Sequence, residues 1–121
     1  TLWSPDIWAD LPPKSQRNTV LKEIPIKVSQ GVAVDKDYFY VISNTKITKY
    51  KKLTNKPVAS WQAQGEKFKY FKHMNSGTIV EGKLYGAHSR FPKDPNDCTV
   101  KIWDVQGEGL NYERSIVMPC K

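Results

Sequence analysis

The sequence lacks the features that mark several large classes of protein. No apolar run approaches the roughly 20 residues of a membrane-spanning helix, so we expect no membrane span. There is no Asn-x-Ser/Thr sequon, and segments with the hydrophobic period of a helix are nearly absent. Cysteine is scarce, since Cys98 and Cys120 are the only two. One disulfide in an exported protein and two free thiols both stay open.

The chain opens "TLWSPDIWADLPPKSQR", with neither an initiating Met nor a signal peptide. We therefore expect a processed form or a fragment. Residues 1–23 are predicted to form an irregular arm because three prolines interrupt any regular element. Within this arm, Ile7, Trp8 and Leu11 have the spacing of one helical turn that docks on a folded body. The 121 residues suffice for one domain with a modest core.

From residue 24 onward the pattern is typical of β-strands. After the alternating "IPIKV", short β-branched and aromatic runs are separated by turn residues. Four such runs predict an antiparallel meander: "GVAV", "YFYVIS", "KITKYK" and "PVASWQ". The same order then recurs as "GTIV", "KLYGAHS", "TVKIWDV" and "LNYERSIV".

Two stretches suggest that this recurrence is a structural repeat. "GVAVDKDYFYVISN" at 31–44 and "GTIVEGKLYGAHSR" at 77–90 align at an offset of 46, which matches Gly31 with Gly77 and Phe39 with Tyr85. Four-stranded units at this period are typical of β-propeller blades, and a single antiparallel sandwich is the alternative. The predicted fold is all-β, with a two-blade propeller-like domain at 24–121: blade one at about 31–62 and blade two at about 77–117.

The run "QGVAVDKDYFYVISNTKITKYKKLTNKPVASW", with "HMNSG", "LYGAHS" and "VKIWD", spans about residues 24–105. It resembles the opening blades of a bacterial and fungal family of secreted β-propellers that are often labelled cycloisomerase-like. The resemblance implies a partial propeller and a secreted or extracytoplasmic location. The sequence departs from the family at Gly86, where Cys is usual, and at Arg90, where Asn is usual.

Polar residues are predicted to meet at one end of the second blade. A turn centred near Glu81–Gly82 would place Ser76 opposite His88 and Asn75 opposite Ser89. Concave rims with convergent polar groups are common ligand sites. The candidate ligand-binding residues are Gln30, Asn44, His73, Asn75, Ser76, His88, Ser89 and Arg90.

Two histidines are the candidates for catalysis. His73 and His88 would be general bases, but no carboxylate is expected beside them, so we predict no metal site and no cofactor. The structural alternative is that His88 forms a hydrogen bond with the backbone of a neighbouring strand. Whether the protein is an enzyme stays open at this point.

The positive charge is concentrated between Lys46 and Lys72. This window contains eight lysines and one acidic residue, Glu66, so its own net charge equals the net charge of +7 of the whole chain. This window is either a site for an anionic ligand or a solvated outer edge that discourages strand pairing. Its end, "EKFKYFKHM" at 66–74, interleaves lysines with aromatic residues, as single-stranded nucleic-acid sites do. We favour aromatic residues that belong to the core, and expect no nucleic-acid partner.

Two hypotheses about function follow. The first is a non-catalytic binding or assembly module, because two blades cannot close a ring of four to eight. Other chains, other copies or the rest of a longer chain would then cover its exposed blade faces. The alternative is a lactonase-like or cycloisomerase-like enzyme. Its small anionic substrate would be polarised at the channel rim by His73, Asn75, His88 and Arg90.

Overall fold

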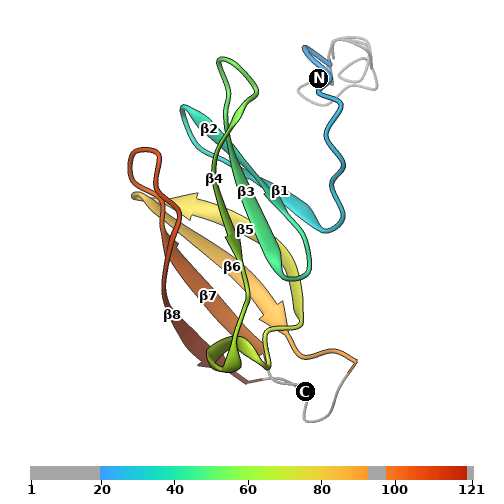
Figure 1. Cartoon of the computed structure of the whole chain (residues 1–121), viewed down its shortest axis with the longest axis vertical. Helices are drawn as coiled ribbons and strands as arrows, with labels where there is room; N and C mark the ends of the chain where they lie inside the picture. The colour runs from blue at the N-terminus through green and yellow to red at the C-terminus, as the bar shows by residue number, and fades with distance from the viewer. Residues whose placement is uncertain (1–19, 93–97, 120–121) are drawn as a thin grey trace, which may run out of the picture.

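A computed structural model describes residues 20–92 and 98–119, so the predicted helical turn around Trp8 lies outside the described residues. Within them, strands form two four-stranded antiparallel sheets, one from β1 to β4 and one from β5 to β8 (Figure 1). Sheet one contains β1 (Gly31–Val34), β2 (Tyr38–Ile42), β3 (Lys46–Lys51) and β4 (Pro57–Gln62). Sheet two contains β5 (His73–Val80), β6 (Lys83–Ser89), β7 (Cys98–Asp104) and β8 (Asn111–Met118).

The predicted all-β fold and the two meanders are confirmed. Sheet one has the predicted bounds, whereas sheet two extends from His73 to Met118 instead of 77–117. It begins earlier because His73 and Met74 pair with Ser89 and His88 of β6, beyond a β-bulge that contains Asn75 and Ser76. The alternating run at 24–28 is not a regular strand, and a short 3₁₀ helix, η2 (Glu66–Phe68), lies in the connection between the sheets. Cys98 is disulfide-bonded, and Cys120 lies outside the described residues.

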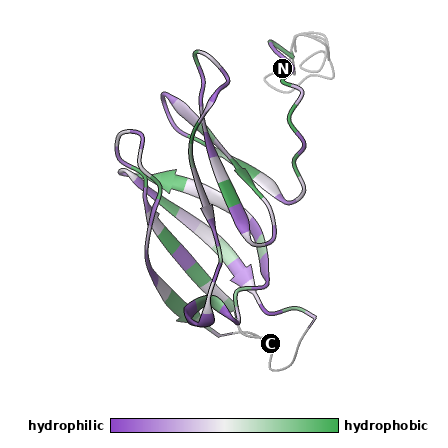
Figure 2. Ribbon diagram, viewed as in Figure 1, coloured by the Kyte–Doolittle hydropathy of each residue, from purple (hydrophilic) through white to green (hydrophobic). Residues whose placement is uncertain are grey.

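The core lies between the two sheets, which pack face to face. Along the strands apolar and polar residues alternate, as Figure 2 shows for β7 and β8, so each sheet directs one set of side chains toward the other. Five aromatic rings fill the space between β4 and the outer strands of sheet two, with neighbouring centroids 5.2–6.3 Å apart. The buried cluster comprises Ala33, Tyr40, Ile42, Ile47, Phe71, Met74, Leu84, Trp103, Val105 and Leu110.

The first strands of the two sheets approach each other closely. A Cβ atom on Gly31 would lie 3.1 Å from the carbonyl oxygen of Asn75, and one on Gly77 would lie 3.0 Å from Cδ1 of Ile42. Glycine is therefore needed on both strands for this approach. Since large aromatic rings separate the outer strands, the interface is wedge-shaped, narrow between β1 and β5 and wide at the outer edge.

The hairpin turns correct the repeat alignment by one residue. In sheet one, the turn residues Lys36 and Asp37 follow Asp35, whose backbone N–H bonds the carbonyl of Tyr38. In sheet two, Glu81 and Gly82 occupy the same two turn positions, with φ angles of 49° and 77°, as a two-residue hairpin turn requires. The first two strands therefore correspond at an offset of 45 rather than 46.

This one-residue correction changes which faces of the two sheets are equivalent, because a shift by one residue turns every side chain to the other face. Tyr40 and Ile42 point toward sheet two and belong to the core. Their counterparts, Tyr85 and Ala87, lie on the face of sheet two that is turned away from sheet one, where Ala87 is exposed. We call this direction forward and the opposite one backward. The forward face of sheet one thus packs on the backward face of sheet two, head to tail.

A buried lysine connects the two sheets at the turn end of the molecule. The ammonium group of Lys49 on β3 donates to the carbonyl oxygens of Val105, Gly107 and Gly109, at 2.7, 2.6 and 2.9 Å. It also lies 4.2 Å from the centroid of the Tyr38 ring, a cation–π distance. The side chain is fully buried, so its charge is satisfied by these groups and not by water.

We expect Lys49→Met to lower the free energy of unfolding by about 2–4 kcal/mol, because it leaves buried carbonyl groups of the β7–β8 turn without their charged donor. Lys56→Met, at an exposed position in the β3–β4 turn, is the matched control and should change it by less than about 0.5 kcal/mol. Urea unfolding followed by tryptophan fluorescence measures both. Equal effects of the two substitutions would contradict the role assigned to Lys49.

The same lysine predicts a dependence of stability on pH. Burial lowers the pKa of Lys49 from its usual 10.5, against the opposing effect of Asp35, Glu108 and Asp104. The unfolded chain then holds this proton more tightly than the folded chain, so the contribution of Lys49 to stability rises with pH between the lowered pKa and 10.5. The difference in unfolding free energy between the wild type and Lys49→Met should therefore increase from pH 7 to pH 10. A decrease would show that folding raises this pKa.

Candidate functional site

The β5–β6 hairpin brings most of the predicted polar residues to one end of sheet two, but in a different register. Met74 pairs with His88 and His73 pairs with Ser89, so the predicted pairs of Ser76 with His88 and Asn75 with Ser89 are wrong. The predicted pairs are symmetric about Gly82, whereas the observed turn contains two residues, Glu81 and Gly82, which shifts the pairing by one position. A β-bulge between Met74 and Gly77 shifts the pairing by one more position. Irregularities of this kind leave little signal in a single sequence.

His73 is joined to the first sheet by a side-chain hydrogen bond. Its Nδ1 lies 2.8 Å from Oδ1 of Asn44, in the β2–β3 turn. Because an amide oxygen only accepts, Nδ1 carries the proton and donates it, which leaves Nε2 as an acceptor. The ring of Phe91 lies 6.2 Å from that of His73, centroid to centroid. Asn44 and His73, two predicted site residues from different sheets, are therefore brought together.

His88 is buried, and the protein itself uses both of its ring nitrogens. The backbone N–H of Lys72 donates to Nε2 at 2.9 Å, so Nε2 is unprotonated and Nδ1 carries the proton. Nδ1 lies 3.1 Å from Oγ1 of Thr99, and the ring packs 4.6 Å from that of Phe71. This geometry matches the structural alternative for His88, a hydrogen bond to neighbouring backbone. It leaves neither ring nitrogen directed at a substrate.

The remaining predicted residues are dispersed. The guanidinium group of Arg90 lies 4.1 Å from the centroid of the Tyr70 ring, and its buried Nε has no hydrogen-bond partner among the described residues. Gln30 uses its backbone N–H to bond the carbonyl of Ile42. Ser76 is exposed within the β-bulge. None of these three lines the cavity described next.

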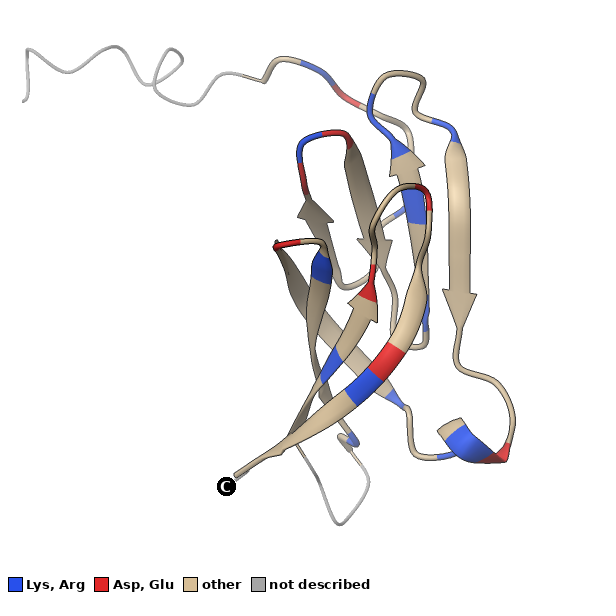
Figure 3. Cartoon of the chain, turned by 90° about the vertical axis from the view of Figure 1, so that its left-hand side faces the viewer, with Lys and Arg blue, Asp and Glu red and all other residues tan. Residues whose placement is uncertain are grey.

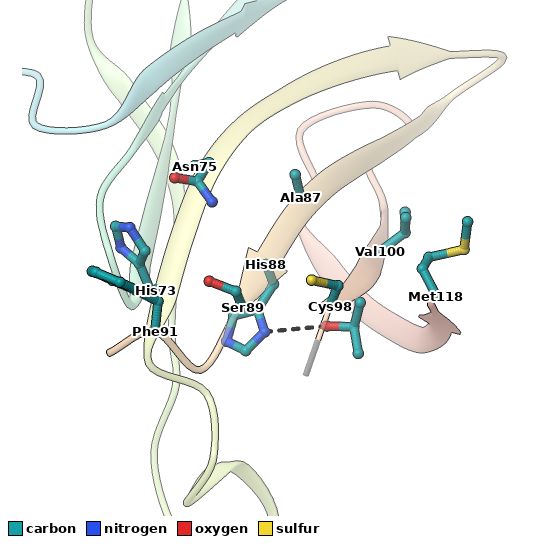
Figure 4. Close-up of a pocket in the computed structure, with 10 residues that line it drawn as sticks. His73, Asn75, Ala87, His88, Ser89, Phe91, Cys98, Val100 and Met118 are labelled. Atoms are coloured by element: carbon teal, nitrogen blue, oxygen red, sulfur yellow. Dashed lines mark hydrogen bonds between the residues drawn. The ribbon is translucent and has the colours of Figure 1, made fainter. Parts of the chain in front are cut away.

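An open cavity of about 540 Å³ lies on the forward face of sheet two. Figure 4 shows His73, Asn75 and Phe91 at one side of it and the apolar Ala87, Val100 and Met118 toward the other. Of the predicted site residues, His73, Asn75, His88 and Ser89 line it. The lining that the sequence did not indicate consists of Ala87, Phe91, Cys98, Thr99, Val100 and Met118. Strand alternation would have found Ala87, Val100 and Met118 once the register was known.

Neither a metal site nor a membrane helix is found in the part of the chain that the structure describes. No three His, Cys, Asp or Glu side chains gather there as metal ligands would. Across residues 20–92 and 98–119, no helix has the length and apolar character needed to cross a membrane.

The lysine-rich window does not form a single anion site. Lys49 is fully buried, so the prediction is wrong for this residue. Lys46 and Lys51 lie at opposite ends of β3, about 17 Å apart at the usual rise of a strand. Figure 3 shows the basic residues distributed over both sheets and η2 rather than gathered on one surface. Lys69, moreover, forms an ion pair with Glu66 at 2.7 Å.

The segment at 66–74 supports the interpretation that its aromatic residues belong to the core. Phe71 is buried in the core cluster and Phe68 packs against it, with its ring 5.2 Å from that of Trp61. Of the two forms expected for this segment, an edge strand or a connection between the blades, residues 66–72 adopt the second, with η2 followed by a turn. Tyr70 is half exposed but lies against Arg90. No row of stacking platforms for bases results.

The chain matches no protein-family model, and no curated protein is significantly similar to it.

The two histidines should respond differently to substitution. We expect His88→Ala to lower the free energy of unfolding by about 2–4 kcal/mol, because it removes a buried ring and leaves the N–H of Lys72 without its acceptor. His73→Ala removes an exposed hydrogen bond and a ring contact with the exposed Phe91, and should change the free energy of unfolding by less than about 0.5 kcal/mol. Urea unfolding of both variants measures this. A stable His88→Ala protein would return His88 to the candidate catalytic residues.

Proposed function

We propose that this chain is a non-catalytic assembly module, a partial β-propeller whose two sheets are successive blades. Its two outer faces would pack against further sheets of the same construction, from other chains or from the rest of a longer one. The single observation that carries the proposal is the head-to-tail packing of the sheets. Each sheet presents a forward and a backward face, so the packing of two leaves one face of each kind uncovered.

The wedge shape of the interface supports the same proposal. In a propeller, blades converge at their inner strands and diverge at their outer strands around a central channel. Here β1 and β5 approach at Gly31 and Gly77, and Trp61, Trp103 and Tyr112 fill the wide edge. The resemblance to the opening blades of secreted propellers agrees with this arrangement.

Both outer faces carry the apolar side chains that such packing needs. On the backward face of sheet one, Val32 and Val34 are 47% and 57% exposed, beside a groove of about 370 Å³ that also includes Phe39 and Val41. On the forward face of sheet two, Met118 is 45% exposed and lines the cavity with Ala87, and Val80 is 50% exposed at the turn end of β5. Contiguous apolar surface of this kind marks sites of protein association.

The alternative, a lactonase-like or cycloisomerase-like enzyme, has less support. Both ring nitrogens of His88 form hydrogen bonds with groups of the protein itself. Arg90 packs on Tyr70 and does not line the cavity. His73 and Asn75 remain at the cavity, but no described carboxylate orients either of them. The disulfide at Cys98 supports the proposed extracytoplasmic location, because disulfides persist in oxidising compartments.

The proposal is tested by the apolar character of the two faces. At a concentration where the chain is monomeric, it should bind a hydrophobic dye such as ANS, and Val34→Lys together with Ala87→Lys should remove most of that binding. The unfolding free energy should stay within about 0.5 kcal/mol of the wild type, because both positions are exposed. Leu53→Lys, at an exposed turn position that lines neither the groove nor the cavity, is the control. A monomer that binds no dye would contradict the proposal.

A further inference from the structure

We infer that the free forward face of sheet two binds the free backward face of sheet one in a second copy of this chain, so that copies assemble head to tail. This inference rests on the proposed function and names the partner. The partner is a copy because the chain itself contains both halves of the contact. The interface between its own two sheets is the template for the contact between copies.

The template assigns each position on the forward face of sheet two a counterpart on sheet one. Ala87 corresponds to Ile42, and Val100 corresponds to Ile47, from the pairing of β2 with β3 and of β6 with β7. Ile42 and Ile47 are completely buried by sheet two. Ala87 and Val100 instead line the open cavity. The cavity therefore lies where a further sheet would pack, and the next copy would cover its apolar residues.

The second copy offers a matching surface. Phe39 and Val41 of sheet one correspond to Leu84 and Gly86 of sheet two, the residues that face sheet one. Both side chains are nearly buried in this chain, while Val32 beside them is half exposed. Together they form an apolar face bounded by Ile24, Ile26 and Val28. The apolar centre of this face carries no charged side chain, whereas Lys22 and Lys52 also line the groove, so charged groups would have to stay hydrated at the rim of the contact.

The polar residues at the edge of the cavity also have counterparts at the interface between the two sheets of the chain. At the existing interface the carbonyl of Asn44 accepts the backbone N–H of Met74, at 3.0 Å. Ser89 is the counterpart of Asn44 at the offset of 45. Its carbonyl would accept a backbone N–H from the residues that precede β1 in the next copy. The polar residues near His73 would then flank an interface between copies.

The contact between copies would lack the buried lysine of the interface within the chain, and should therefore be weaker. The counterpart of Lys49 is Ile102, so no buried ammonium group joins one copy to the turn of the next. Each copy also carries a net charge of +7, which opposes association at low salt. We therefore expect assembly that depends on protein concentration and increases with salt. A forward-to-backward contact is heterologous and closes into a ring where the rotation allows. With four to eight blades in a ring, two to four copies would close it.

Complementation between two variants tests this inference. Ala87→Arg blocks the forward face and Val32→Arg blocks the backward face, both at exposed positions that should tolerate the change. Each variant alone should be monomeric by light scattering coupled to size exclusion. Their equimolar mixture should form a one-to-one dimer, because one intact face remains on each. Wild type and the control Leu53→Arg, at an 86% exposed turn position, should form species of two or more copies under the same conditions.

Three results would overturn the inference: a wild type that stays monomeric at high concentration and high salt, single variants that assemble like the wild type, or a mixture that stays monomeric. The first differs from failure of the proposed function. A monomer that binds dye on its outer faces still has faces for other sheets, whereas a monomer without dye binding has neither property. Circular dichroism of each variant checks that the substitutions leave the sheets folded.

Discussion

A sheet with apolar side chains on both faces needs cover on both, and this constraint organises the molecule. Sheet one covers one face of sheet two with Tyr40, Ile42 and Ile47, and each sheet then has one face left. In a sandwich, two like faces meet and the requirement ends there. Here equivalent residues of the two sheets point in the same direction, so each sheet keeps one apolar face that only a further sheet can cover. The function that we propose is the consequence of this packing.

Lys49 fixes how the two sheets are placed on each other. Its ammonium group is held by three carbonyl oxygens of one turn, and Tyr38 and Tyr40 lie beside it. Tyr40 in turn donates to a carboxylate oxygen of Asp35 at 2.8 Å, and burial together with this bond raises the pKa of Tyr40. A buried charge tolerates few alternative arrangements. The lysine therefore makes one contact specific, while hydrophobic burial supplies most of the stabilisation.

Local patterns predicted the strands, their antiparallel order and the bounds of sheet one, because alternation and turn residues act over a few positions. Register was harder to predict. The alignment of Gly31 with Gly77 matched residue types at an offset of 46, whereas the two hairpins correspond at an offset of 45. The site depended on that register, so His73 and Asn44 were found while the pairing of His88 was missed. Lys49 was counted among solvent-exposed lysines because nothing within its own strand shows that a distant turn supplies its acceptors.

The central claim is that the two uncovered faces are the two halves of one interface. A photo-cross-linking amino acid at position 87 tests it most directly, with the same group at position 53 as the control. The structure predicts that position 87 cross-links to peptides from residues 24–42 of another copy, identified by mass spectrometry of isotopically mixed chains. Cross-links from position 87 only within one chain, or between copies at other peptides, would contradict the claim.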